Sequence, residues 1–161
     1  MTIIHLEMTS PDQLVPGNPP PSSLELTEVG PEAAAEIGDL YRQTWEPLAT
    51  GGRLTWSDGQ WADELAPPTI HTWVATVHGD AAGFAELSVE PEGVVGIVVF
   101  GLVPTYQGRG FGAAFLTEVI RTAWTLADPT TRVWLQTSST DHPHALPNYR
   151  RRGFQILKRT S

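Results

Sequence analysis

The sequence predicts an α+β domain in which a mixed, mostly antiparallel sheet is flanked by helices. Two neighbouring segments, 71–78 and 83–90, alternate apolar and polar residues around Gly79-Asp80, as the strands of a hairpin do. An apolar stripe at helical spacing follows at 110–127. Strands outnumber helices in the middle of the chain, which argues against a doubly wound parallel sheet.

The bulk composition indicates one soluble globular domain. The chain has 161 residues, of which 40% are hydrophobic and 17% charged. No apolar run approaches the length of about 18 residues that a membrane span needs, and "MTIIHLEMTS" lacks the features of a secretory signal. The absence of cysteine excludes disulfides, thiol nucleophiles and cysteine-bound metals. We therefore expect a cytoplasmic protein.

Charge is distributed unevenly along the chain. Residues 1–100 hold two arginines against fifteen acidic residues, whereas residues 101–161 hold eight basic residues against three acidic ones. The first part favours a cationic ligand and the second an anionic one, the alternative being ordinary solvated surface. A net charge of −8 argues against a broad nucleic-acid surface.

The first elements follow from breakers and periodicity. Residues 3–8 and 24–29 are predicted strands, separated by the Pro-rich, extended segment 10–23. The domain is therefore expected to occupy 24–161, with 1–23 as an N-terminal extension and linker. A helix is predicted from Pro31 to about 46. A second helix follows, capped by Ser57 or Thr55.

The remaining elements flank a glycine-rich loop. Segment 93–103 is apolar throughout, as a central strand buried on both faces is. Segment 132–139 is a predicted strand, 147–152 a short helix, and 154–159 the last strand. Between the apolar strand and the helix at 110–127 lies "QGRGFG", 107–112. Unpaired backbone N–H groups and the helix dipole make such a loop an anion site suited to a pyrophosphate.

Several ligand patterns compete for this loop. Gly108-x-Gly110-x-x-Ala113 formally satisfies the dinucleotide fingerprint, with Asp128 about 20 residues further on. Its context opposes that reading, because too little chain follows for a second mononucleotide half. A Walker loop and a Gly-x-Ser-x-Gly elbow are absent. His142 and His144 lack zinc spacing, so no metal is expected.

The segment resembles the acyl-CoA signature of the GNAT acyltransferase superfamily, Gln/Arg-x-x-Gly-x-Gly/Ala, at positions 107–112. The apolar lead-in with Pro and Tyr is present at Phe100, Leu102, Pro104 and Tyr106. A second family element, Ala-x-x-x-Tyr-x-x-x-Gly-Phe, is matched at Ala145, Tyr149, Gly153 and Phe154, and "AAGFAEL" resembles the family's third strand. The resemblance implies a GNAT-like sheet, splayed at the cofactor site, and N-acetyltransferase activity with acetyl-CoA as co-substrate.

By position, the resemblance also implies roles. Backbone groups around Phe100 and Leu102 would pair with pantetheine like an added strand. The pyrophosphate would be held by Gln107, Gly108, Arg109, Gly110, Phe111, Gly112 and Ala113. Tyr149 would lie near the thioester sulfur and protonate the departing thiolate, since a phenol with a pKa of about 10 is an acid slightly weaker than a thiol of about 8.5.

The family's usual general base is missing. Many members carry a glutamate eleven residues before the Gln/Arg of the signature, and that position here is Gly96. Glu86 and His142 are the candidate substitutes, with Asp141 and His144 beside the latter. There are three alternatives: Glu86 is only an exposed acid on a strand, the turn that holds His142 is only solvated, or an amine that is already neutral attacks without a base.

Aromatic residues gather where the family covers its acceptor. Tyr41, Trp45 and Trp56 lie there among several carboxylates, a combination that suits an organic ammonium. We therefore expect a small amine as acceptor, against the alternative that the tryptophans only pack helices onto the sheet. Two further functions stay open: a non-catalytic CoA-binding module, and a transferase using another donor such as aminoacyl-tRNA.

The end of the chain departs from the family. Members often end with two strands after Gly-Phe, whereas eight residues remain here from Phe154. The last strand is therefore missing, exchanged with a partner, or replaced by residues 3–8. Dimers are common in similar families, so a homodimer remains open.

Overall fold

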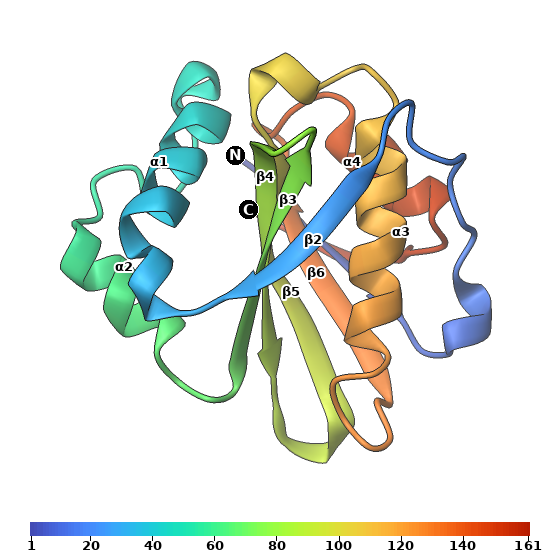
Figure 1. Cartoon of the computed structure of the whole chain (residues 1–161). Coiled ribbons are helices and arrows are strands. Elements are labelled where there is room, and N and C mark those ends of the chain that lie inside the picture. The colour runs from blue at the N-terminus through green and yellow to red at the C-terminus, as the bar shows by residue number, and fades with distance from the viewer.

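A seven-stranded sheet runs between two layers of helices (Figure 1) in the computed structural model, which describes residues 1–161. The strands are β1 (Ile3–Met8), β2 (Leu24–Val29), β3 (Ile70–Val77), β4 (Asp80–Val89), β5 (Val94–Leu102), β6 (Arg132–Ser138) and β7 (Gln155–Thr160). The helices are α1 (Ala34–Trp45), α2 (Asp58–Leu65), α3 (Phe111–Ala123) and α4 (Ala145–Arg151). The predicted α+β class with a mixed, mostly antiparallel sheet is confirmed.

The helices cover opposite faces of the sheet. α1 and α2 pack on one face, where the side chains of Trp61 and Phe84 are fully buried. α3 packs on the other face through Phe115, Leu116 and Ile120, the apolar stripe that the sequence contains. Ser57, not Thr55, caps α2, in a capping box with Gln60. None of the helices combines the length and apolar character that crossing a bilayer requires.

The first strand lies near the end of the sheet. The strand order is β2-β3-β4-β5-β6-β1-β7, and β1 pairs antiparallel with both β6 and β7. Ile4 and Leu6 are buried there, and Glu7 pairs with Arg132 at 2.6 Å. Of the three possibilities for the missing last strand, the structure therefore has residues 3–8 in its place. Residues 1–23, predicted as an extension and linker, contribute a strand to the same sheet.

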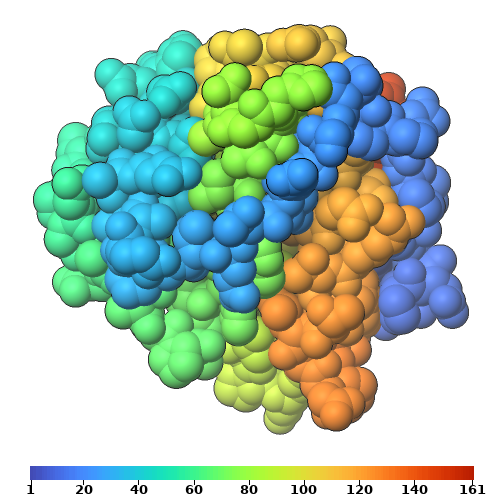
Figure 2. Space-filling view, viewed as in Figure 1, coloured from blue at the N-terminus to red at the C-terminus, as the bar shows by residue number.

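The Pro-rich segment returns along α3. The backbone N–H of Gly17 donates to Thr117 Oγ1 at 2.9 Å, and that of Val15 donates to the carbonyl of Arg152 at 2.9 Å. In Figure 2 the blue atoms of the N-terminal segment lie beside the orange atoms of α3. This path connects β1, at one side of the sheet, with β2 at its opposite edge.

The sheet opens between two of its central strands. β5 and β6 run parallel but pair only over Val94–Ile97 and Arg132–Leu135, although β5 continues to Leu102 and β6 to Ser138. Their ends diverge after this short ladder. The predicted splay is therefore present: the ends of β5 and β6 do not pair with each other, although each still pairs with its other neighbour, β4 or β1.

Candidate active site

The glycine-rich loop presents free backbone at the start of α3. Gly108 and Gly110 have backbone φ values of +69° and +89°, a conformation that residues with a side chain rarely adopt. No side chain caps α3, so the N–H groups of its first turn have no side-chain acceptor. A Cβ atom at Gly108 would meet nothing within 4 Å. The loop thus combines accessible amides with the positive end of the helix dipole.

This loop forms one wall of a pocket of about 410 Å³, here called the loop pocket. The opposite walls come from the end of β5 and from α4 with its preceding turn. Seven of the nine residues predicted to bind a cofactor line it: Phe100, Leu102, Gln107, Gly108, Gly110, Gly112 and Ala113. The pocket has the size of sites that hold small molecules and cofactors.

The other two predicted cofactor residues lie elsewhere. Arg109 donates to the carbonyl of Thr105 at 2.9 Å and stacks over the rings of Tyr106 and Phe111. The side chain of Phe111 is buried in the core below α3. Arg151 of α4 lines the loop pocket instead and supplies a cation that lies outside the glycine-rich motif.

A second pocket, of about 240 Å³, lies between the diverging ends of β5 and β6 and is here called the strand pocket. Ile3 of β1 and Thr50 of the α1–α2 connection also line it. Four residues line both pockets: Trp45, Phe100, Asp141 and Tyr149. The two pockets therefore meet at these four side chains.

Tyr149 is held at this junction by its packing. Its ring lies against those of Phe100 and Phe154, at centroid distances of 6.1 and 6.4 Å. Burial raises the pKa of the Tyr149 phenol above its ordinary value of 10, and the negative charge of Asp141 raises it further. The phenol is therefore protonated throughout the physiological pH range.

Three donors hold the carboxylate of Asp141. Trp45 Nε1 donates to Oδ1 at 3.2 Å, the backbone N–H of His142 donates to Oδ1 at 2.7 Å, and Thr137 Oγ1 donates to Oδ2 at 2.9 Å. The turn after β6 is thereby tied to α1 and to β6 itself. His142, a predicted base, lines the loop pocket but not the strand pocket, and its Nδ1 accepts from the N–H of His144.

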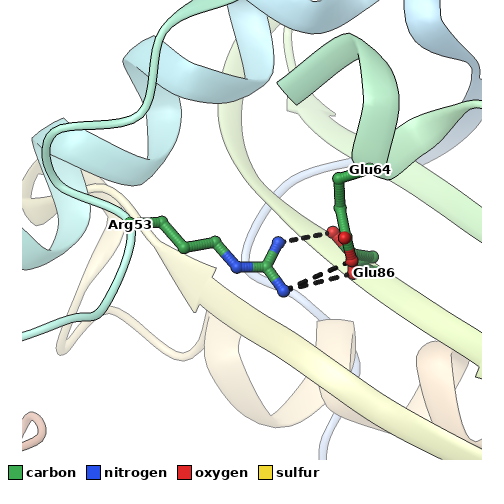
Figure 3. A network of polar contacts seen from close by, with 3 residues as sticks. All are labelled: Arg53, Glu64 and Glu86. Atoms are coloured by element: carbon green, nitrogen blue, oxygen red, sulfur yellow. Dashed lines mark hydrogen bonds and ion pairs between the residues drawn. The ribbon is translucent and has the colours of Figure 1, made fainter. Parts of the chain in front are cut away.

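Glu86, the other predicted base, lines neither pocket. Its side chain is fully buried, and Arg53 Nη1 binds its Oε1 at 2.9 Å while Nη2 also reaches Glu64 at 3.4 Å (Figure 3). Burial, together with a hydrogen bond to Glu64, raises the pKa of Glu86 to about 8 against the opposing effect of Arg53. Glu86 is therefore enclosed by Arg53 and Glu64, and its role as a base stays a prediction.

The same arginine explains the position of Trp56. The Arg53 guanidinium lies 4.5 Å from the ring centroid of Trp56 and 5.2 Å from that of Trp61. Trp56, one of the three aromatic residues predicted to receive an organic ammonium, therefore contacts a cation of the chain itself. Tyr41 and Trp45, the other predicted acceptor residues, do line the strand pocket, whereas Trp56 does not.

These features match a known family. The sequence profile of the acetyltransferase (GNAT) family matches residues 34–154, and the chain belongs to this family. Among curated proteins, none matches the chain.

Solved structures agree with this fold. A GCN5-related N-acetyltransferase from Sphaerobacter thermophilus is similar with a TM-score of 0.72 at 21% identity, over 98% of this chain and 49% of that one. An acetyltransferase from Thermus thermophilus gives 0.68 at 18% identity, over 84% and 89%. PaiA N-acetyltransferase from Thermoplasma acidophilum, in complex with coenzyme A, gives 0.51 at 17%, over 63% and 72%. The chain spans about half the length of the Sphaerobacter protein.

Proposed function

We propose that this protein transfers an acyl group, acetyl first of all, from acyl-CoA to a small amine. The observation that carries the proposal is the meeting of two pockets at Tyr149, one built on the glycine-rich loop and one between the diverging strands. An acyl donor in the first and an amine in the second would bring both reactants to the same phenol.

The residues of the loop pocket fit coenzyme A. The amides of 108–113 would hold the pyrophosphate, with Arg151 as a nearby cation, and the unpaired end of β5 would bind pantetheine along its backbone. The coenzyme A in the Thermoplasma relative supports the same ligand here. Bound acyl-CoA supplies the acyl group as a thioester, which an amine can attack directly.

Tyr149 would act as hydrogen-bond and proton donor to the sulfur of the leaving thiolate. In each transfer one C–N bond forms and one C–S bond breaks. An amine that binds as ammonium loses one proton to solvent before its lone pair attacks and a second after the C–N bond forms, and the sulfur gains one. Because the raised pKa keeps Tyr149 protonated, its hydroxyl first stabilises the developing charge on sulfur as a hydrogen-bond donor. Transfer of the phenol proton to the thiolate is uphill when the pKa of Tyr149 is raised, so it is coupled to the return of a proton from the nitrogen to Tyr149 by way of water.

A second candidate is a non-catalytic CoA-binding module, and Gly96 is the observation that favours it, because the position lacks the family's usual carboxylate. Two measurements separate the candidates. Calorimetry with coenzyme A tests the loop pocket, and thiol release from acetyl-CoA with a panel of primary amines tests transfer. Binding without amine-dependent release supports the module, and the absence of binding overturns both.

A further inference from the structure

The strand pocket contains one carboxylate, that of Asp141. No other Asp or Glu lines either pocket, and the carboxylates of Glu86 and Glu64 are occupied by Arg53. We infer that Asp141 binds the positively charged nitrogen of the acceptor and selects cationic amines over neutral molecules of the same shape. This inference rests on the proposed function, because it assigns the acceptor to the strand pocket.

The hydrogen bonds of Asp141 leave its charge uncompensated. All three donors are neutral, namely an indole N–H, a backbone N–H and a hydroxyl, and no Lys or Arg forms an ion pair with it. The side chains of Arg151, His142 and His144 line the loop pocket and not the strand pocket. A ligand in the strand pocket therefore meets the negative charge directly.

Asp141 also has room for one more donor. A carboxylate offers about four lone-pair sites, and the protein occupies two on Oδ1 and one on Oδ2. An ammonium N–H would donate to the remaining lone-pair site of Oδ2. The donors already present fix the orientation of the carboxylate before the ligand arrives, so little conformational entropy is lost on binding.

The remainder of the pocket suits an apolar body next to the charge. The rings of Tyr41 and Trp45 are tilted by 38° with their centroids 4.6 Å apart, and Phe100 and Tyr149 line the same space. Aromatic faces attract an organic cation and bury the carbon atoms attached to it. The volume of about 240 Å³ limits the ligand to a small molecule. The expected class is a small arylalkyl or alkyl primary amine.

Binding of two matched probes tests this inference without requiring turnover. At about pH 7, 2-phenylethylamine is a cation and 2-phenylethanol is its neutral counterpart. Calorimetry on the protein with excess coenzyme A should give an amine Kd lower than the alcohol Kd by about tenfold or more. In Asp141→Asn the two probes should bind with similar Kd values. An unchanged preference for the amine in that variant, or no amine binding to the wild type, overturns the inference.

Two further variants separate charge from structure. Thr137→Val removes one donor to Asp141 but keeps its charge, so the amine preference should persist. Glu46→Gln removes an exposed carboxylate next to Trp45 and outside both pockets, and it should leave the preference unchanged. If Thr137→Val loses the preference as Asp141→Asn does, the charge is not what selects the ligand. Failure of thiol release with every acceptor, in a protein that retains the preference, overturns the proposed function alone.

Discussion

The indole of Trp134 occupies the place where a side chain at position 96 would lie. A Cβ atom built on Gly96 would be 2.5 Å from Cζ2 of Trp134, which pairs with Gly96 across the β5–β6 ladder. Trp134 Nε1 donates to Glu90 Oε2 at 2.7 Å, so the indole cannot move away without losing that bond. The family's usual glutamate is therefore replaced by packing, and position 96 cannot regain a carboxylate without a change at 134.

We expect Gly96→Ala to destabilise the fold by about 1–3 kcal/mol, because the added methyl overpacks a rigid neighbour. Gly52→Ala is the matched control, since a Cβ atom there meets nothing within 4 Å. Its free energy of unfolding should stay within about 0.5 kcal/mol of the wild type. Urea unfolding measures both, and equal stability of the two variants would contradict the packing argument.

Gly108→Ala should weaken coenzyme A binding by about tenfold or more, because its methyl enters the loop pocket where the backbone must approach the ligand. Gly79→Ala has the same kind of positive φ and equally open surroundings, but it lies in the β3–β4 turn. Each variant should lose roughly 1–2 kcal/mol of stability from backbone strain. Calorimetry should detect weaker coenzyme A binding only in Gly108→Ala. Equal coenzyme A binding by both variants would show that the glycine-rich loop does not contact the ligand.

Tyr149→Phe should lower turnover of acetyl-CoA by about 10²-fold or more while the Kd for coenzyme A remains the same. The substitution keeps the ring contacts with Phe100 and Phe154 and removes only the hydroxyl. Tyr106→Phe, at a tyrosine outside both pockets, is the control. Thiol release reports turnover, and a fully active Tyr149→Phe would exclude the phenol as proton donor.

Glu86 should make stability fall as pH rises. Its pKa is raised from 4.5 to about 8 in the folded protein, chiefly by burial, so between these values the folded state binds more protons than the unfolded chain. The protonated carboxyl thus stabilises the fold fully below about pH 4.5, and this contribution is lost as pH rises to about 8.

Glu86→Gln lacks this titration, so the stability of the wild type relative to the variant should decrease between about pH 5 and pH 8. Urea unfolding at both pH values measures the difference, in which titrations of other groups cancel. A relative stability that increases over this interval would mean that the ion pair with Arg53 outweighs the burial of the charge.

Leu6→Ala should cost about 2–5 kcal/mol, the usual range for a leucine removed from a core. Leu6 is 1% exposed, between β6 and β7. Val15→Ala, at a residue of the same N-terminal segment that is 54% exposed, should change stability by less than about 0.5 kcal/mol. Thermal unfolding of both variants decides whether β1 belongs to the cooperative unit, and equal melting temperatures would exclude it.

Local patterns predicted most elements of this fold. The period-two segments became β3 and β4, the apolar run became β5, and the helical stripe became α3. Such patterns could not predict the pairing partners of β1, because alternation identifies a strand but not the strands beside it. Its short, half-apolar sequence carried no sign of which edge or gap it would fill.

The site was predictable where a signature covers it and less so in its loops. The glycine positions followed from the spacing at 107–112, but Asp141 lies in a turn whose direction no periodicity reveals. One feature of the sequence marked Arg53 as a candidate: it is one of only two basic residues among the first 100 and is close in sequence to Trp56 and Glu64. A buried carboxylate on β4 needs such a cation, and burial of Glu86 becomes visible only when the sheet is assembled.

The position of β1 has a consequence for synthesis on the ribosome. β1 is made before both of its partners, which follow more than 120 residues later. During translation its apolar face, with Ile4, Leu6 and Met8, has no partner to cover it. The nascent chain therefore carries an unpaired strand until β6 and β7 have left the exit tunnel, and this side of the sheet closes only then.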